Sequence, residues 1–97
     1  MGGRLAVLLY TEARGSLMIG FSVSKKTGGS VTRNLVKRRL RESVRAILPN
    51  LKNGYHLIFV ARSSIVSANF QEIKETIYKL VKKAGLLAEG KNENPLH

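Results

Sequence analysis

Residues 20–45 read GFSVSKKTGGSVTRNLVKRRLRESVR and predict three consecutive elements of the fold. This stretch opens inside an apolar run, Leu17 to Ser24, that has strand composition, and the paired Lys and paired Gly of residues 25–30 then break the pattern. From Val31 to Leu48 the apolar residues recur at helical spacing. Four of them lie within about 80° of arc on the helix surface. They are Val36, Leu40, Val44 and Ile47. The stretch predicts a strand, a loop and an amphipathic helix that packs one face on a core.

Two further apolar runs complete a sheet. Arg4 to Glu12 is rich in Leu and Val, and the short Gly-containing connection before Leu17 predicts that the first two strands form a β-hairpin. Pro and Asn residues after the helix precede YHLIFVA at Tyr55–Ala61, a continuous apolar run of strand length. This run predicts a third strand at the centre of the sheet.

A second helix is expected near the C-terminus. Asn69 and Glu72 have the spacing of a capping box, and apolar residues follow at steps of three and four as far as Leu87. Gly85 is a candidate for the C-terminal cap, or Gly90 if the helix continues further. We expect residues 88–97 to form a flexible tail.

The resulting order is strand, strand, helix, strand, helix. This order predicts the α+β class, in the form of a small two-layer α/β sandwich with both helices on one sheet face and the other face open. A chain of 97 residues has room for one domain, so we take residues 1–97 as a single RNA-binding domain once the charge pattern below is included. A crossover between parallel strands would by default be right-handed.

Positive charge is concentrated in the first helix and the loop before it. The chain has 17 Lys and Arg against six acids, a net charge of +11, which attracts polyanions. Eight of the bases and one acid, Glu42, fall between residues 25 and 45, a net of +7. The bases are Lys25, Lys26, Arg33, Lys37, Arg38, Arg39, Arg41 and Arg45.

Part of this charge forms a ridge along one side of the predicted helix. At 100° per residue five polar side chains lie within about 100° of arc, beside the apolar stripe. We call these residues the basic ridge: Asn34, Lys37, Arg38, Arg41 and Arg45. A solvated helix normally mixes charges of both signs, whereas an Arg-rich face matches phosphate oxygens. The ridge therefore favours contact with nucleic acid over an ordinary solvated surface.

Composition argues against several other classes. There is no Cys and no Asp, and one of the two His ends the chain, which leaves little for a disulfide framework, a metal site or acid-base catalysis. The longest apolar run, Leu5 to Tyr10, is too short to span a bilayer. We therefore expect no metal, no catalytic residue and no membrane role, and a cytoplasmic setting.

The same residues resemble a known family, the bacterial ribonuclease P protein subunit. Its pattern of a Val-Ser-Lys-Lys strand end, a Gly-containing turn and a helix opening Arg-Asn-x-x-Lys-Arg-x-x-Arg is matched here by residues 23–41. The resemblance continues through Leu57–Arg62 to about Leu87. It implies an unusual left-handed βαβ crossover in place of the default hand.

The resemblance also implies a function. Proteins of this family bind the catalytic RNA of ribonuclease P, which removes the 5′ leader of precursor tRNA, and the RNA holds the magnesium ions and performs the chemistry. The chain would then belong to a tRNA-processing endoribonuclease, a ribonucleoprotein hydrolase, and would supply no catalytic group and hold no cofactor of its own.

Two sets of site residues follow by position. Residues of the family's helix motif and its entrance would bind the catalytic RNA, and Arg45 joins them on charge alone: Lys25, Lys26, Arg33, Asn34, Lys37, Arg38, Arg41 and Arg45. The family's cleft for the single-stranded leader crosses the open sheet face. Its residues here would be Leu8, Tyr10, Val60 and Arg62.

One departure from the family affects the second set. The family's basic N-terminal helix has no counterpart, and residues 1–3 look like an abrupt or engineered start. We therefore expect an uncovered sheet face, presenting Leu8, Tyr10, Ile58 and Val60, that self-associates and discriminates leader-bearing tRNA poorly.

Other functions stay open on the residues alone. A basic structural RNA-binding protein of ribosomal-protein type would carry a similar ridge, and preference for ribosomal RNA would identify it. A self-sufficient metal-dependent nuclease is opposed by the absence of Asp, and cleavage by the protein without RNA would support it. A role at a membrane surface is the weakest alternative.

Overall fold

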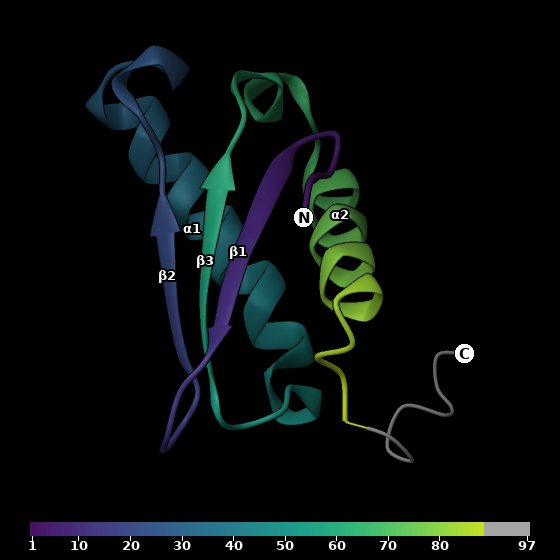
Figure 1. Ribbon diagram of the computed structural model, residues 1–97. Helices are drawn as coiled ribbons and strands as arrows, with labels where there is room; N and C mark the ends of the chain where they lie inside the picture. The colour runs from purple at the N-terminus through teal and green to yellow at the C-terminus, as the bar shows by residue number, and fades with distance from the viewer. Residues whose placement is uncertain (89–97) are drawn as a thin grey trace.

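The computed structural model describes residues 1–88, which form one layer of strands and one layer of helices (Figure 1). The strands are β1 (Ala6–Glu12), β2 (Met18–Ser22) and β3 (Tyr55–Ala61), and the helices are α1 (Ser30–Ile47) and α2 (Phe70–Lys83). Short 3-10 turns, η1 (Lys25–Thr27), η2 (Leu48–Asn50) and η3 (Ser63–Ser67), connect them. The predicted α+β order is confirmed. The predicted tail lies outside the described residues from position 89 onward.

β3 occupies the centre of the sheet. The strand order is β1-β3-β2, with β3 antiparallel to β1 and parallel to β2. The predicted central strand is confirmed, but the predicted β1–β2 hairpin is wrong, because β3 is inserted between the two strands. The connection at residues 13–17 crosses the start of β3, where the Ala13 amide donates to the Gly54 carbonyl at 2.9 Å. Strands two positions apart are separated by about 10 Å, which five residues span easily.

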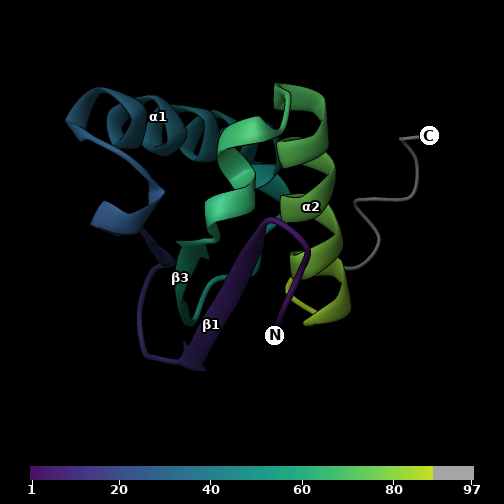
Figure 2. The same cartoon turned by 90° about the horizontal axis from the view of Figure 1, so that it is seen from above.

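The crossover from β2 through α1 to β3 is left-handed. In Figure 1, β2 and β3 both point upward, β3 lies to the right of β2, and α1 passes behind the sheet. A right-handed crossover to the right would place the helix in front of the sheet. Figure 2, the view from above, also places α1 and α2 on the same side of the strands. The hand that the family resemblance implied is therefore confirmed, and so is the single layer of helices.

The core lies between the sheet and the two helices. From the sheet, Leu8, Leu57 and Phe59 are almost completely buried, and α1 contributes the predicted stripe. From α2 the buried residues are Ile73, Ile77, Leu80 and Val81. One polar side chain of α1 is buried among them, and the hydroxyl of Ser43 donates to the Arg39 carbonyl at 2.8 Å. Both helices are thus held by their apolar faces, which leaves their polar faces toward solvent.

Local hydrogen bonds begin and end α2 as predicted. The Glu72 amide donates to Asn69 Oδ1 at 2.8 Å, and the Asn69 amide donates to Glu72 Oε1 at 2.9 Å, which completes the capping box. After the helix, Gly85 has a φ of 75°, a left-handed conformation that glycine adopts readily. The Leu86 amide then donates to the Val81 carbonyl at 3.0 Å. These contacts fix the direction in which the chain leaves α2.

The capping box gives a test of local stability. We expect Asn69→Ala to lower the free energy of unfolding by about 1 kcal/mol, because the Glu72 amide loses its acceptor. Urea unfolding followed by circular dichroism measures the change. Asn69→Asp, which keeps an acceptor at this position, should remain close to wild type, and an equal loss in both variants would contradict the role of the cap.

Candidate nucleic-acid interface

The basic ridge is present and accessible on α1. Asn34, Arg38, Arg41 and Arg45 are exposed and Lys37 is half-buried. The buried positions of α1 are Val36, Leu40, Ser43 and Val44, so the ridge adjoins the core face instead of opposing it. The 18-residue helix is about 27 Å long, and the ridge follows it for about three turns. An extended line of cations of this kind can contact several successive phosphates.

The turn before α1 adds positive charge at the start of the ridge. Lys25 and Lys26 are exposed in η1, and Arg33 Nε donates to the Gly28 carbonyl at 3.1 Å, which ties the first turn of α1 to this loop. Gly28 has a φ of 154°, and a Cβ there would lie 2.9 Å from Cγ2 of Thr32. A residue with a side chain would therefore push the loop away from the helix.

No acidic or capping side chain lies at the N-terminus of α1. Gly29 occupies the N-cap without a side-chain hydrogen bond, and the first turn contains no acid. The first amides of a helix carry partial positive charge, which here adds to that of the neighbouring lysines. Nearby, the buried hydroxyl of Thr27 has no hydrogen-bond partner among the described residues.

Carboxylates do not neutralise the ridge within residues 1–88. The ion pair found in this part of the chain joins Arg4, before β1, to Glu72 in the first turn of α2 at 3.6 Å, and both side chains are well exposed. The ridge cations make no such pair with a described carboxylate. Their charge is available to an external polyanion, and the eight predicted RNA-binding residues all lie in η1 and α1, where Arg33 is half-buried.

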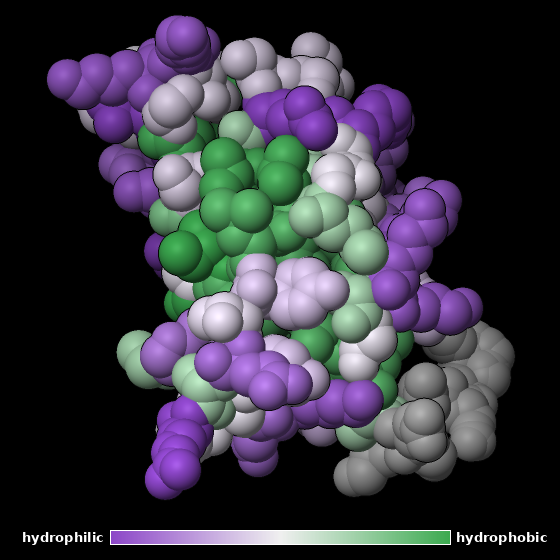
Figure 3. Space-filling view, in the orientation of Figure 1, coloured by the Kyte–Doolittle hydropathy of each residue, from purple (hydrophilic) through white to green (hydrophobic). Residues whose placement is uncertain are grey.

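The open face of the sheet is a second, chemically different surface. Figure 3 shows an apolar patch across the strands on this face, with polar atoms around it. We call these residues the open face: Val7, Leu9, Met18, Ile58 and Val60. Leu9 is 52% exposed, Met18 61% and Ile58 45%. Gly20 pairs with Ile58 and adds no side chain, so the surface over Ile58 stays uncovered.

The register corrects half of the predicted leader set. Leu8 pairs with Phe59 and Tyr10 with Leu57, which places both residues on the helix side of the sheet. Leu8 is 0% exposed, so the prediction that it lines the open face is wrong. Tyr10 is 41% exposed, and its ring on this side of the sheet is 6.5 Å from that of Tyr55.

The other two residues of the predicted leader set lie at the end of β3. Val60 is on the open face, and Arg62 follows β3 directly and is exposed. Arg62 Nε donates to the Gly3 carbonyl at 2.8 Å, so its guanidinium also holds the N-terminal segment. That segment runs back along β1, with the Leu8 amide donating to the Met1 carbonyl at 2.8 Å. The predicted residues Val60 and Arg62 are thus brought together, and Leu8 and Tyr10 are separated from them.

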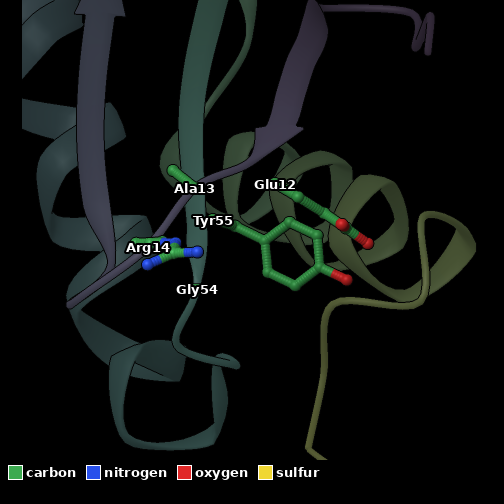
Figure 4. A pocket seen from close by; sticks show the side chains of 5 residues that line it. All are labelled: Glu12, Ala13, Arg14, Gly54 and Tyr55. Atoms are coloured by element: carbon green, nitrogen blue, oxygen red, sulfur yellow. The ribbon is translucent and has the colours of Figure 1, made fainter.

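A further hollow lies at the loop end of the sheet and has no clear chemistry. It is lined by residues of the β1–β2 connection and the start of β3: Glu12, Ala13, Arg14, Gly54 and Tyr55. Figure 4 shows the Tyr55 ring with Arg14 on one side of it in this view and Glu12 on the other. Among residues 1–88 no three His or carboxylate side chains converge to hold a metal ion, and neither helix could cross a membrane.

Comparison with known proteins adds independent information. The family described as Ribonuclease P matches residues 1–85. The ribonuclease P protein component of Caldanaerobacter subterraneus subsp. tengcongensis is 54% identical over 70 residues, which cover 72% of this chain and 60% of that protein. The protein of the same name from Thermoanaerobacter sp. (strain X514) is 43% identical over 89 residues, covering 91% and 77%. The chain therefore spans 60% of the length of the first relative.

Solved structures agree in fold. The RNase P protein of Staphylococcus aureus superposes with a TM-score of 0.82 at 25% identity, covering 90% of this chain and 81% of that chain. The RNase P protein of Thermotoga maritima gives a TM-score of 0.79 at 22% identity, covering 86% and 80%. The second likeness, at that identity, concerns the fold alone.

The facing of β1 can be tested by two adjacent substitutions. We expect Leu8→Ala to lower the free energy of unfolding by about 2–5 kcal/mol, because it leaves a cavity in the core. Leu9→Ala, on the open face, should change it by less than about 1 kcal/mol. Chemical unfolding measures both values, and the reverse order of the two would show that β1 is turned over.

Proposed function

The chain belongs to the ribonuclease P protein family, and on that basis we propose that it is the protein subunit of a ribonuclease P. In this role it binds the catalytic RNA and assists removal of the 5′ leader from precursor tRNA. The observation that carries the proposal is the match of the family to residues 1–85 together with a ridge of cations that no described carboxylate neutralises. RNA is the polyanion that these features fit.

The basic ridge, Lys25, Lys26 and Arg33 form the contact with the catalytic RNA. Their guanidinium and ammonium groups donate to phosphate oxygens, and each neutralised phosphate releases counterions. Asn34 adds a donor and an acceptor among the cations. Binding by such a surface depends on the shape of the RNA backbone more than on base identity.

Chemistry is assigned to the RNA. The described residues of the chain do not fit a metal ion, since no cluster of metal-ligating side chains is found among them. In this proposal the described residues perform no catalytic step, and the RNA subunit binds the magnesium ions. The protein acts by holding the RNA and the substrate, in the cytoplasm where precursor tRNA is processed.

The precursor leader is assigned to the open face. Val7, Leu9, Ile58 and Val60 offer apolar contact to unstacked bases, and Arg62 stands at the end of β3 to meet a phosphate. The same apolar face can also recruit a second copy of the chain. The leader and a second copy would then compete for one surface.

Reconstitution tests the proposed function directly. The chain is added to a bacterial ribonuclease P RNA at low magnesium, and removal of the 5′ leader from precursor tRNA is followed on a gel. We expect the protein to restore cleavage, and to bind this RNA in preference to ribosomal RNA. Preference for ribosomal RNA without restored cleavage would favour the structural RNA-binding alternative.

Salt dependence and paired substitutions test the basic ridge. A ridge that contacts about five phosphates predicts a slope of about −4 in the plot of log affinity against log salt concentration. Replacing Arg38 and Arg41 by Ala should weaken binding about tenfold or more and reduce the slope by about 2. The matched control is Ala at Lys82 and Lys83, two exposed cations at the end of α2. Equal losses in the two double variants would mean that total charge, and not the ridge, provides the affinity.

The corrected open face gives a further test. We expect Ile58→Ser to lower further the weak discrimination between leader-bearing and leaderless tRNA and to reduce self-association, because it removes apolar area at the middle of the face. Val66→Ser, another half-exposed apolar position, lies in η3 and serves as the control. Competition binding measures leader discrimination, and light scattering measures self-association. If Ile58→Ser changed neither, the leader and the second copy would bind at a surface other than the open face.

A further inference from the structure

A small apolar crevice lies between the free edge of β2 and α1. Its lining residues come from β2, from α1 and from the turn after it: Ile19, Phe21, Arg41, Val44, Arg45 and Leu48. β2 is an edge strand, so the crevice opens at the outer edge of the sheet. Ile19 pairs with Leu57 and Phe21 with Phe59, both core residues, which places the crevice on the helix side and away from the open face.

One wall of the crevice is the aromatic ring of Phe21, which packs against a buried ring in the core. The ring of Phe21 stacks on that of buried Phe59, with 6.0 Å between centroids and 18° between planes. Phe21 lines the crevice, whereas Phe59 does not. Phe21 is half-buried, and Val44 beside it is almost fully buried. A planar apolar group that entered here would meet a preformed aromatic surface.

The volume of the crevice limits what can enter. It is about 180 Å³, below the roughly 300 Å³ at which pockets for drug-sized ligands begin. The space suits a single ring system or one large apolar side chain. An extended ligand could place only one such group in it.

Two arginines of the basic ridge line the crevice with the apolar parts of their side chains. Arg41 and Arg45 are one helical turn apart, both are exposed, and both line the crevice. An occupant should therefore combine a planar apolar body with negative charge on either side of it. A nucleotide within an RNA strand has this combination, since its base can stack while its phosphates accept from arginine.

We propose that the crevice holds one unstacked base of the catalytic RNA, stacked against Phe21, while the flanking phosphates accept from Arg41 and Arg45. This inference rests on the proposed function and adds to it a site that reads the RNA by stacking as well as by charge. The catalytic RNA, and not the leader, is the source of the base, because the crevice adjoins the basic ridge and lies on the opposite side of the sheet from the open face.

Two variants and a matched control test the stacked base. Phe21→Leu keeps an apolar side chain and removes the ring, and Ile19→Phe fills the crevice without removing a cation. We expect each to weaken binding of ribonuclease P RNA about 5- to 20-fold, the lower part of the range for loss of one stacked base. Phe70→Leu is the control, since Phe70 is a half-exposed ring at the start of α2, away from the crevice.

The salt slope separates stacking from phosphate contact. Phe21→Leu and Ile19→Phe should leave the slope of log affinity against log salt unchanged, whereas Arg41→Ala should lower it by about 1. Chemical probing of the bound RNA provides a second readout. One nucleotide should change its reactivity on binding wild-type protein and Phe70→Leu, and should keep the reactivity of free RNA with Phe21→Leu. Thermal unfolding of Ile19→Phe checks that the fold is retained.

Defined outcomes overturn the proposal. If wild-type protein binds the RNA and the ridge variants weaken it, but Phe21→Leu and Ile19→Phe bind normally, the base is absent from the crevice. The free β2 edge would then be open to a protein segment that adds a strand and places an apolar side chain beside the arginines. The proposal would also be overturned if Phe21→Leu or Ile19→Phe lowered the salt slope as much as Arg41→Ala does. Failure of wild-type protein to prefer ribonuclease P RNA is a different result, which overturns the proposed function itself.

Discussion

Pairing of β3 with both neighbouring strands sets the arrangement of the other elements. β3 pairs with β1 on one side and with β2 on the other, and Leu57, Phe59 and Ala61 on its inner face are all buried in the core. Because β3 takes the centre, β2 becomes an edge strand and α1 must cross behind the sheet to connect them. The position of α1, and with it the direction of every cation on the basic ridge, follows from that pairing.

The positive charge on α1 does not prevent the helix from packing on the core, because its buried face contains no charged residue. Its buried face is short and made of small and branched residues, Val36, Leu40 and Val44, so the helix is held to the core without using any charged side chain. Self-repulsion among the arginines opposes the compact state, and few carboxylates are present to offset it. A bound polyanion relieves that repulsion, so RNA binding and stability of the folded chain favour each other.

Local features could be predicted from the sequence, and pairing of distant residues could not. The capping box at Asn69 and Glu72 and the apolar stripe of α1 depend on residues within a few turns of one another, and both predictions are confirmed. The hairpin failed because β3, forty residues later, competes for the same strand edges with a more apolar sequence. Leu8 and Tyr10 were assigned to the wrong face because AVLLY and YHLIFVA are apolar at both parities, so only the register with the core tells the faces apart.

β2 is the element that the two proposed RNA surfaces share. Along this strand Met18 and Gly20 face the open side, whereas Ile19 and Phe21 face the crevice and the basic ridge. Side chains one residue apart on a strand point to opposite faces, so the separation between the two surfaces is the thickness of a single strand with its side chains. On the proposed function, the catalytic RNA and the precursor leader are therefore held a fixed distance apart by a rigid element. The hand of the crossover matters for the same reason, because it places α1 on the face of the sheet toward which Phe21 points, where the arginines and Phe21 can form one site.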